Sequence, residues 1–392
     1  MTPAARVQSA IEILDLIIAA ARSGGAPADR IIAEWFKTRR YAGSGDRRAV
    51  RELAYAAIRA CGEIPVSGRA AMLRVAKGDA ALTGLFDGSP HGPAPIASGD
   101  ALAGAGTAPR WLTDALGASD IDGDEAAALL GRAPLDIRVN SLNASREALE
   151  LPIAGEPTVA TNGLRLPFGT PVDQWDAFTA GQIEVQDTGS QLACEAVGAK
   201  PGETVIDLCA GAGGKTLALA AAMDNRGILV ACDSDRRRLS QLPPRAERAG
   251  ATIIETLLLN PGAEAAALEP WLGKADAVLV DAPCSGTGTW RRNPEARWRL
   301  NPKEMKRLTE LQARLLDLAA TLIRPGGRLV HVVCSLLDAE GADQIAAFLE
   351  RNPGWRAEPL ALPAGSPRGA GLRLTPGHDG TDGFFIARLE RL

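Results

Sequence analysis

From residue 202 onward, short apolar runs alternate with stretches of helical periodicity, and this alternation limits the folds open to the chain. Strands that alternate with helices in this way form parallel sheets with helices on both faces. Ligands of such sheets bind beyond the carboxyl ends of the strands. Predicted strands span 204–208, 228–232, 251–259, 275–280 and 328–333, and two more strand-like runs, 372–375 and 383–389, close the chain.

The rest of the chain has a different pattern. Apolar residues recur at helical spacing in 4–60, ten of the 27 residues in 84–110 are Gly or Pro, and 134–178 holds short β-like runs. We therefore expect a helical domain over 1–83, an irregular linker with short helices over 84–133, a small α+β module over 134–180 and the main α/β domain over 181–392.

Composition excludes several classes of protein. Of the 392 residues, 46% are apolar and 23% charged, unlike a disordered chain, and no stretch fits a membrane helix or a secretory signal. The six cysteines lack the spacing of a zinc site, so we expect free thiols in a reducing, cytoplasmic compartment, with no metal and no membrane partner. The formal charge of −4 counts against nucleic-acid binding, although 30–59 and 291–314 are locally basic.

The loop after the first predicted strand, DLCAGAGGKT at 207–216, places glycines between a strand and a helix. Such glycines let backbone N–H groups approach a ligand at the positive end of the helix. A phosphate-binding loop would need glycine in place of Cys209, and a dinucleotide fingerprint from Gly211 would need it in place of Thr216. Neither nucleotide motif is met, so a glycine-rich ligand turn or a structural tight turn remains.

Asp233 ends the second predicted strand, 20 residues after Gly213. A carboxylate at this point can accept hydrogen bonds from ribose hydroxyls. NAD and S-adenosylmethionine both carry a ribose, so Asp233 indicates an adenosine-type ligand or is a solvated acid at a strand end.

The third loop, DAPCSGTGT at 281–289, places an acid and a thiol after an apolar strand. Asp281 can accept from the N4 amine of cytosine, as carboxylates do when they read that base. Arginines interleaved with tryptophans follow, a combination that suits a phosphate backbone and stacked bases. We expect contact with RNA through Arg291, Arg292, Arg297 and Trp298, with a solvated basic surface as the alternative.

A second thiol, Cys334, follows the strand predicted at 328–333, on the same sheet edge as Cys284. Carbon 5 of cytosine becomes nucleophilic when a thiolate adds to carbon 6, and it can then attack an electrophilic methyl group. A nearby cation such as Lys215 could lower a thiol pKa from its usual value of about 8.5. Either cysteine could instead be inert packing.

Together these motifs resemble the Sun family of RNA cytosine-5 methyltransferases, in particular its RsmB-type branch, which modifies small-subunit ribosomal RNA. The resemblance covers roughly 134–392; besides the DAPCSGTGT block it includes VQDTGSQLACEAV (185–197), VIDLCAGAGGKT (205–216), VVCS (332–335) and TPGHDGTDGFF (375–385). Residues 1–80 resemble, more weakly, the NusB-like helical RNA-binding domain of that branch. The resemblance implies a class I, Rossmann-like methyltransferase fold, S-adenosylmethionine as cofactor and RNA, above all 16S rRNA, as partner.

The resemblance also implies residue roles. Cys334 is the expected nucleophile, Cys284 assists product release and Asp281 lies between cofactor and target base, with Lys215 as a further catalytic candidate. From the residues alone, Cys284 is an equally good nucleophile. The expected cofactor-binding residues are Cys209, Ala210, Gly211, Ala212, Gly213, Gly214, Lys215, Asp233, Asn260 and Asp281.

Two positions depart from the family pattern. Ala212 stands where the family has a proline, and Asn260 stands where an acid near the adenine is expected, so its amide would have to replace that acid. The second departure leaves open an RNA-binding or ribosome-assembly protein with a degenerate methyltransferase domain. An NAD-dependent oxidoreductase is disfavoured because GxGxxG is absent.

Overall fold

The computed structural model describes residues 1–392 and forms two compact units. The first comprises Met1–Gly131 with the distant segment Thr289–Pro302, and the second comprises Arg132–Gly288 and Lys303–Leu392. The helical unit thus continues beyond the boundary expected at residue 83 and includes a segment that the sequence placed in the α/β domain. None of the helices combines the length and the apolar composition that crossing a membrane requires.

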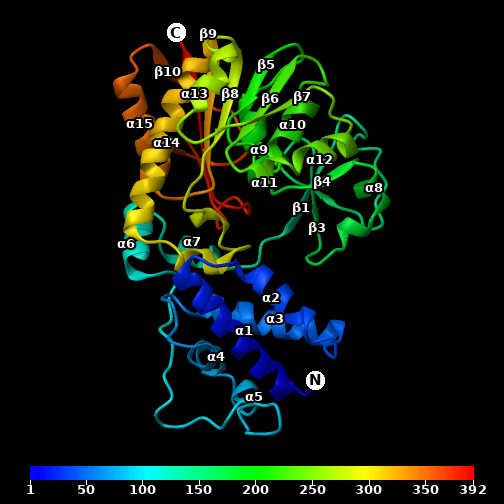
Figure 1. Ribbon diagram of the computed structural model, residues 1–392, viewed down its shortest axis with the longest axis vertical. Helices are drawn as coiled ribbons and strands as arrows, with labels where there is room; N and C mark the ends of the chain where they lie inside the picture. The colour runs from blue at the N-terminus through cyan, green and yellow to red at the C-terminus, as the bar shows by residue number, and fades with distance from the viewer. The chain divides into compact units, whose positions relative to one another are not determined.

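The first unit is built from helices (Figure 1). Helix α1 (Pro3–Ser23) begins where the Thr2 hydroxyl accepts from the Ala5 N–H, and it ends at Gly24, whose φ of 72° suits glycine. A Cβ at Gly68 would lie 2.2 Å from the carbonyl oxygen of Ile11, so this glycine lets α4 approach α1. The other helices are α2 (Ala28–Lys37), α3 (Ser44–Ala60), α4 (Gly68–Ala76), α5 (Ala80–Thr83), α6 (Arg110–Ala118), α7 (Gly123–Ala128) and the 3-10 helix η4 (Pro294–Trp298).

The second unit begins with a small antiparallel sheet in the order β2-β3-β1-β4. Its apolar side chains, among them Ile137 and Trp175, form a core of their own. The α+β module expected at 134–180 corresponds to this sheet, whose last strand lies beyond residue 180. Its elements are β1 (Leu135–Val139), β2 (Glu156–Pro157), β3 (Gly163–Leu166), η1 (Val172–Gln174), α8 (Asp176–Thr179) and β4 (Ile183–Val185).

The main sheet has nine strands in the order β11-β12-β13-β9-β8-β5-β6-β7, with β10 paired to β13. Strands β5 to β9 pair in parallel, as expected, but β13 pairs antiparallel with β9 and the other C-terminal strands are antiparallel too. A parallel neighbour needs a long crossover connection, and only a loop joins β12 to β13. The strands are β5 (Thr204–Asp207), β6 (Ile228–Asp233), β7 (Ile254–Leu258), β8 (Ala275–Asp281), β9 (Ile323–Val333), β10 (Trp355–Glu358), β11 (Ser366–Arg368), β12 (Gly371–Leu374) and β13 (Phe384–Arg391).

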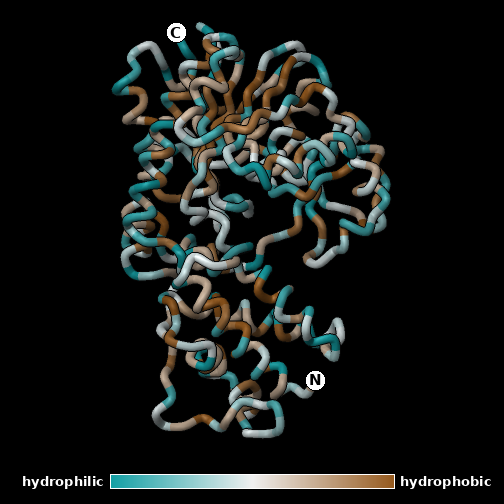
Figure 2. The backbone as a smooth tube through the Cα atoms, viewed as in Figure 1, coloured by the Kyte–Doolittle hydropathy of each residue, from teal (hydrophilic) through white to brown (hydrophobic).

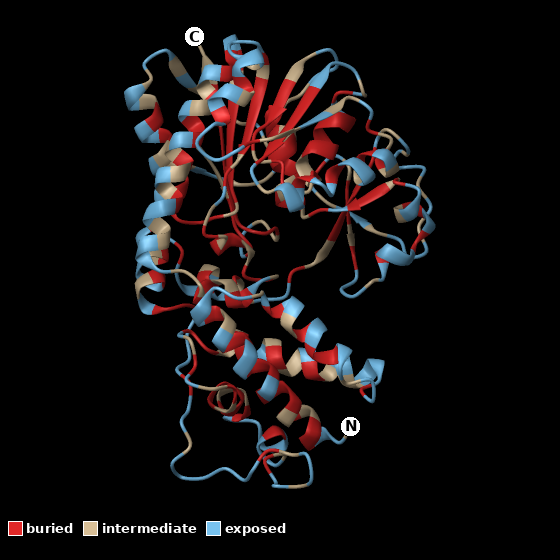
Figure 3. Cartoon of the chain, in the orientation of Figure 1, coloured by how far each residue is buried: buried red, intermediate tan, exposed pale blue.

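Helices cover both faces of this sheet because alternate residues of its strands point to opposite sides (Figure 1). Val205 packs with α9, α10 and α12, whereas Ile206 packs with α14 and α15. The central strands are apolar (Figure 2) and buried (Figure 3). The helices are α9 (Thr188–Val197), α10 (Gly214–Ala222), α11 (Arg236–Leu239), α12 (Leu242–Ala249), α13 (Glu264–Leu268), α14 (Pro302–Leu322) and α15 (Ala342–Arg351), with 3-10 helices η2 (Glu269–Trp271), η3 (Thr287–Thr289) and η5 (Asp338–Glu340).

Candidate active site

The carboxyl ends of β5, β6, β8 and β9 meet at one edge of the main sheet, because these strands run in parallel. A cavity of about 330 Å³ opens there. Its walls include Asp233, Asp281, Cys284 and Cys334. Four residues that the sequence singled out, on three different loops, therefore share one cavity.

The two cysteines of this cavity lie side by side, with their Sγ atoms 3.4 Å apart. Cys334 directly follows β9, and Cys284 follows the end of β8. The N–H of Gly288 donates to the Cys334 carbonyl oxygen at 3.0 Å, so the loop that carries one thiol is bonded to the residue that carries the other. The hydrogen bond with Cys334, together with burial, raises the pKa of the Cys284 thiol well above its usual value. Cys284 therefore keeps its proton at neutral pH.

An ion pair joins the glycine-rich loop to the end of β8. Lys215 Nζ lies 2.7 Å from Asp281 Oδ2 and 5.6 Å from the ring centroid of Phe384. Burial, the largest single influence, would lower the pKa of Lys215, but the charge and hydrogen bond of Asp281, together with Cys194 and Cys334, raise it. The site therefore holds a permanent ammonium beside a carboxylate.

The glycine-rich loop adopts a conformation that needs its glycines. Gly211 and Gly213 have φ values of 57° and 85°, and a Cβ at Gly213 would lie 2.1 Å from Leu242 Cδ1. The Gly211 N–H donates to Asp233 Oδ2 at 2.7 Å, and the Asp235 N–H donates to Asp233 Oδ1 at the same distance. Asp233 thus holds the loop in place while the second lone pair of each oxygen can accept from another donor.

The residues at this edge fit an adenosyl cofactor. Gly211 lies against Arg238, a residue of the cavity wall, and Asp233 offers an acceptor for ribose hydroxyls. Of the expected cofactor residues, Cys209, Asp233 and Asp281 line the cavity. The remaining residues of the loop, Ala210, Gly211, Ala212, Gly213, Gly214 and Lys215, lead from Cys209 into α10.

Asn260, like the loop residues 210–215, is not among the residues that line the cavity. Its side chain is exposed, whereas the preceding Leu259 lines the cavity. Glu264, in α13, reaches the cavity wall and pairs with Arg314 of α14 at 2.8 Å. Burial would raise the pKa of Glu264, but the hydrogen bond and charge of Arg314 lower it. The sequence analysis missed this acid, which lies only four positions after Asn260.

The arginine and tryptophan segment after the third loop belongs to the helical unit. Arg297 is 0% exposed, and its Nη2 donates to the carbonyl oxygens of Ile58 at 2.6 Å and Cys61 at 2.9 Å. Trp298 Nε1 donates to the Gly62 carbonyl oxygen at 3.2 Å. Burial lowers the pKa of Arg297 to about 10. The expectation that Arg297 and Trp298 contact RNA is therefore wrong for this structure, because both side chains are buried and hydrogen-bonded to the backbone of the first unit.

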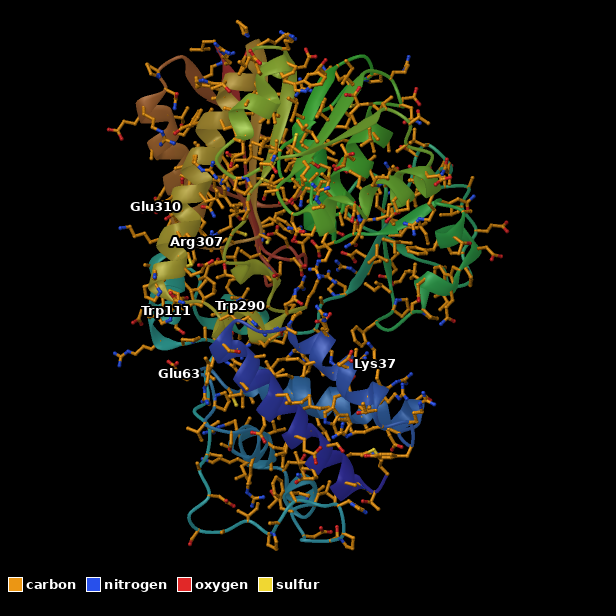
Figure 4. The ribbon with its side chains drawn as sticks, in the orientation of Figure 1. Lys37, Glu63, Trp111, Trp290, Arg307 and Glu310 are labelled. Atoms are coloured by element: carbon orange, nitrogen blue, oxygen red, sulfur yellow. The ribbon has the colours of Figure 1, made fainter.

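Other residues of the same segment are also largely covered. Arg291 is buried, and Trp290, labelled in Figure 4, is fully buried. Arg292 is intermediate in exposure and remains the residue of this set with the most accessible side chain. By contrast, Arg307 and Glu310, also labelled in Figure 4, lie exposed on α14.

Comparison with known proteins places these features in a family. The model of the 16S rRNA methyltransferase RsmB/F family matches residues 195–390. A probable ribosomal RNA small subunit methyltransferase B of Synechocystis sp. is 36% identical over 66% of this chain and 60% of its own length. The ribosomal RNA small subunit methyltransferase B of Xylella fastidiosa is 36% identical over 75% of this chain and 70% of its own.

A solved structure shares the architecture of the whole chain. The crystal structure of PH0851 matches it with a TM-score of 0.74 and 26% identity, covering 100% of this chain and 99% of that one. The chain spans less than two thirds of the Synechocystis relative, so the match to that protein is partial.

Proposed function

Because the chain belongs to the 16S rRNA methyltransferase RsmB/F family, we propose that it methylates carbon 5 of a cytidine in small-subunit ribosomal RNA. The observation that carries this proposal is the 3.4 Å separation of the Cys284 and Cys334 sulfurs in a cavity that also holds Asp281. One half-buried thiol is ordinary packing, whereas two thiols beside a paired acid supply addition to a pyrimidine and release from it.

The methyl donor of this fold class is S-adenosylmethionine, which supplies an electrophilic methyl group. The residues that would hold it are the turn at Gly211 and Gly213, Asp233 at the ribose and the apolar Leu259 beside the adenine. The strand ends and α14 line the cavity, which is partly open to solvent.

Lys215 and Asp281 are suited to hold the cytosine edge that carries N3 and N4. The carboxylate accepts a hydrogen bond from the N4 amine, and the ammonium donates to N3. When the Cys334 thiolate adds to carbon 6, a sulfur–carbon bond forms and the electron pair of the ring double bond moves towards N3. The positive charge of Lys215 stabilises that electron pair, and carbon 5 becomes the nucleophile.

Cys284 is assigned to the release step. Its Sγ lies 3.4 Å from the Cys334 sulfur, next to the carbon to which that sulfur adds. In the release step Cys284 gives its proton to solvent, and the resulting thiolate takes the proton from carbon 5. As that proton leaves, the ring double bond re-forms and the bond between Cys334 and carbon 6 breaks. The net change is a methyl group in place of one hydrogen, with one proton released to solvent.

The target cytidine has to leave its base stack. A base inside a helix hides carbons 5 and 6, and the cysteines lie in a cavity rather than on a protruding surface. The substrate is therefore an unpaired or flipped cytidine.

Two single substitutions test the proposal. Cys334→Ala should abolish transfer of radiolabelled methyl groups to 16S rRNA, because no sulfur then adds to carbon 6. Cys284→Ala should leave protein covalently attached to RNA, seen as a slowly migrating band on a denaturing gel. An active Cys334→Ala enzyme, or a covalent complex that forms with Cys334→Ala and not with Cys284→Ala, would overturn the assignment.

A degenerate methyltransferase domain is the second candidate, and the exposed position of Asn260 is the observation that favours it. Calorimetric titration with S-adenosylmethionine separates the two, because a degenerate domain would release no heat of binding.

A further inference from the structure

Glu340 is a completely buried acid for which the proposed reaction has no use. It ends the short 3-10 helix η5 after β9 and is 0% exposed. Its carboxylate is met by neutral donors: Ser285 N–H reaches Oε1 at 2.8 Å and Gln312 Nε2 reaches Oε1 at 3.0 Å, while the Ser285 hydroxyl donates to Oε2. Burying a carboxylate among neutral groups costs stability that an apolar residue of similar volume would not cost. Its position therefore calls for a reason other than stability.

The partners of Glu340 lie next to the two cysteines. Ser285 follows Cys284 in the chain, Ser335 follows Cys334, and their hydroxyl oxygens are 3.2 Å apart. The hydrogen bond between the two serine hydroxyls therefore joins the residues that directly follow the two cysteines. Gln312 Nε2 adds a bond to the carbonyl oxygen of Pro283 at 2.9 Å, on the other side of Cys284.

The hydrogen bonds of this cluster have one consistent direction. A carboxylate can only accept, so the Ser285 hydroxyl donates to Glu340 and its oxygen is left to accept from Ser335. Ser335 in turn accepts from the N–H of Leu337 at 3.2 Å. Glu340 is the acceptor at which this chain of donors ends, and a neutral amide at the same place would reverse one of its bonds.

We propose that Glu340 is a positioning residue that sets the separation of the Cys284 and Cys334 sulfurs by tying together the two loops that carry them. The use of this sulfur–sulfur distance in catalysis rests on the function proposed above. The role of Glu340 in setting the distance does not depend on that function. Glu340 touches neither thiol and does not line the cavity, so it positions them through Ser285, Ser335 and Gln312, while its charge helps to raise the pKa of Cys284.

The test uses Glu340→Gln, which keeps the shape of the side chain and turns one acceptor oxygen into a donor. The matched control is Asp338→Asn, the same chemical change in the same 3-10 helix, on a carboxylate that pairs with Arg368 instead. The probe is phenylarsine oxide, which bonds to two adjacent thiols through arsenic and releases one water. Mass spectrometry of digested protein locates the bridge at Cys284 and Cys334.

We expect Glu340→Gln to bind the arsenical about tenfold more weakly than the control does, as for other groups that orient ligands. Methyl transfer should fall about 100-fold in kcat, because displacement of a reacting group by 1 Å has an effect of that order. The Kd for S-adenosylmethionine should stay at the control value, which a general loss of folding would not allow. Arsenical affinity and kcat equal to those of Asp338→Asn would overturn the inference.

If Glu340→Gln does not fold, Ser335→Ala replaces it, since this removes the bridging hydroxyl and leaves Glu340 bonded to Ser285. Its arsenical affinity must then fall in the same direction, or the inference is wrong. The arsenical measurement needs no RNA, so a wild-type protein that fails to methylate cytidine would contradict the proposed function and leave this comparison intact.

Discussion

Lys215 Nζ lies 2.7 Å from Asp281 Oδ2, which joins the first turn of α10 to the end of β8. If this pair holds the cytosine edge, Asp281→Asn should lower kcat for RNA methylation about 100-fold, the usual effect of removing one charged group that stabilises a transition state. The measurement is transfer of radiolabelled methyl groups to 16S rRNA at saturating S-adenosylmethionine.

Asp276→Asn is the matched control for that change. Asp276 lies near the opposite end of β8, where it pairs with Arg324 at 2.7 Å, far along the strand from the cysteines. Its loss should alter stability and leave kcat of the folded enzyme at the wild-type value. Equal kcat values for the two variants would remove Asp281 from the mechanism.

Asp207 makes stability depend on pH in the direction opposite to that of most acids. Burial, reinforced by the charge of Asp281, raises its pKa to about 7, although the Thr216 hydroxyl bonds to it. The folded chain keeps this proton up to about pH 7, while the unfolded chain loses it near pH 3.8. Stability is therefore lost as pH rises between those values, by roughly 4 kcal/mol.

Asp207→Asn should remove that loss, because an amide does not ionise. Urea unfolding of wild type and variant at pH 5 and pH 8 measures it, and the variant should gain relative to wild type at the higher pH. If the free energies of unfolding of wild type and variant change equally between pH 5 and pH 8, Asp207 is already ionised in the folded chain at pH 5, and the prediction is wrong.

Glu264 is expected to serve the adenine end of the cofactor in place of Asn260. Its carboxylate lies in the cavity wall, held by Arg314, and can accept a hydrogen bond from the adenine amino group. Glu264→Ala should weaken binding of S-adenosylhomocysteine about tenfold in calorimetric titration, the value of a hydrogen bond to a charged group. Asn260→Ala is the control and should bind as wild type; the reverse order of affinities would restore Asn260 to the site.

Arg297 should matter for folding rather than for RNA. Arg297→Ala removes a buried guanidinium and its hydrogen bonds to the carbonyl oxygens of Ile58 and Cys61, at a cost of about 3 kcal/mol. Arg48→Ala removes the same charge from an exposed position of the same unit and should change stability little. Chemical unfolding compares the two, and equal stabilities would contradict the structural role.

The sequence was most informative where a motif follows a parallel strand. Cys284 and Cys334 are 50 positions apart, yet their strands are neighbours in a parallel sheet, so the rule on strand ends brought them together. The antiparallel direction of the C-terminal strands was not predicted, because an apolar run does not record how a strand is connected.

Burial explains the remaining misses. Arginine and tryptophan together are as suited to a buried hydrogen-bonded interface as to RNA, and only packing distinguishes Arg297 from a phosphate ligand. Glu264 and Glu340 carry no local signal, since each gains its importance from partners on other elements.

The helical unit draws its core from two stretches of chain that are far apart in sequence. Trp298 lies in one cluster with residues of α1, α2, α3 and α4, and the Ala28 N–H donates to Glu295 at 2.9 Å. A polypeptide that begins at Arg132 lacks α1 to α4, so Trp298 and Arg297 would lose the helical residues that they contact. A chimaera between two relatives therefore has to take the first 131 residues and the Thr289–Pro302 segment from the same parent, although the two segments are far apart in the sequence.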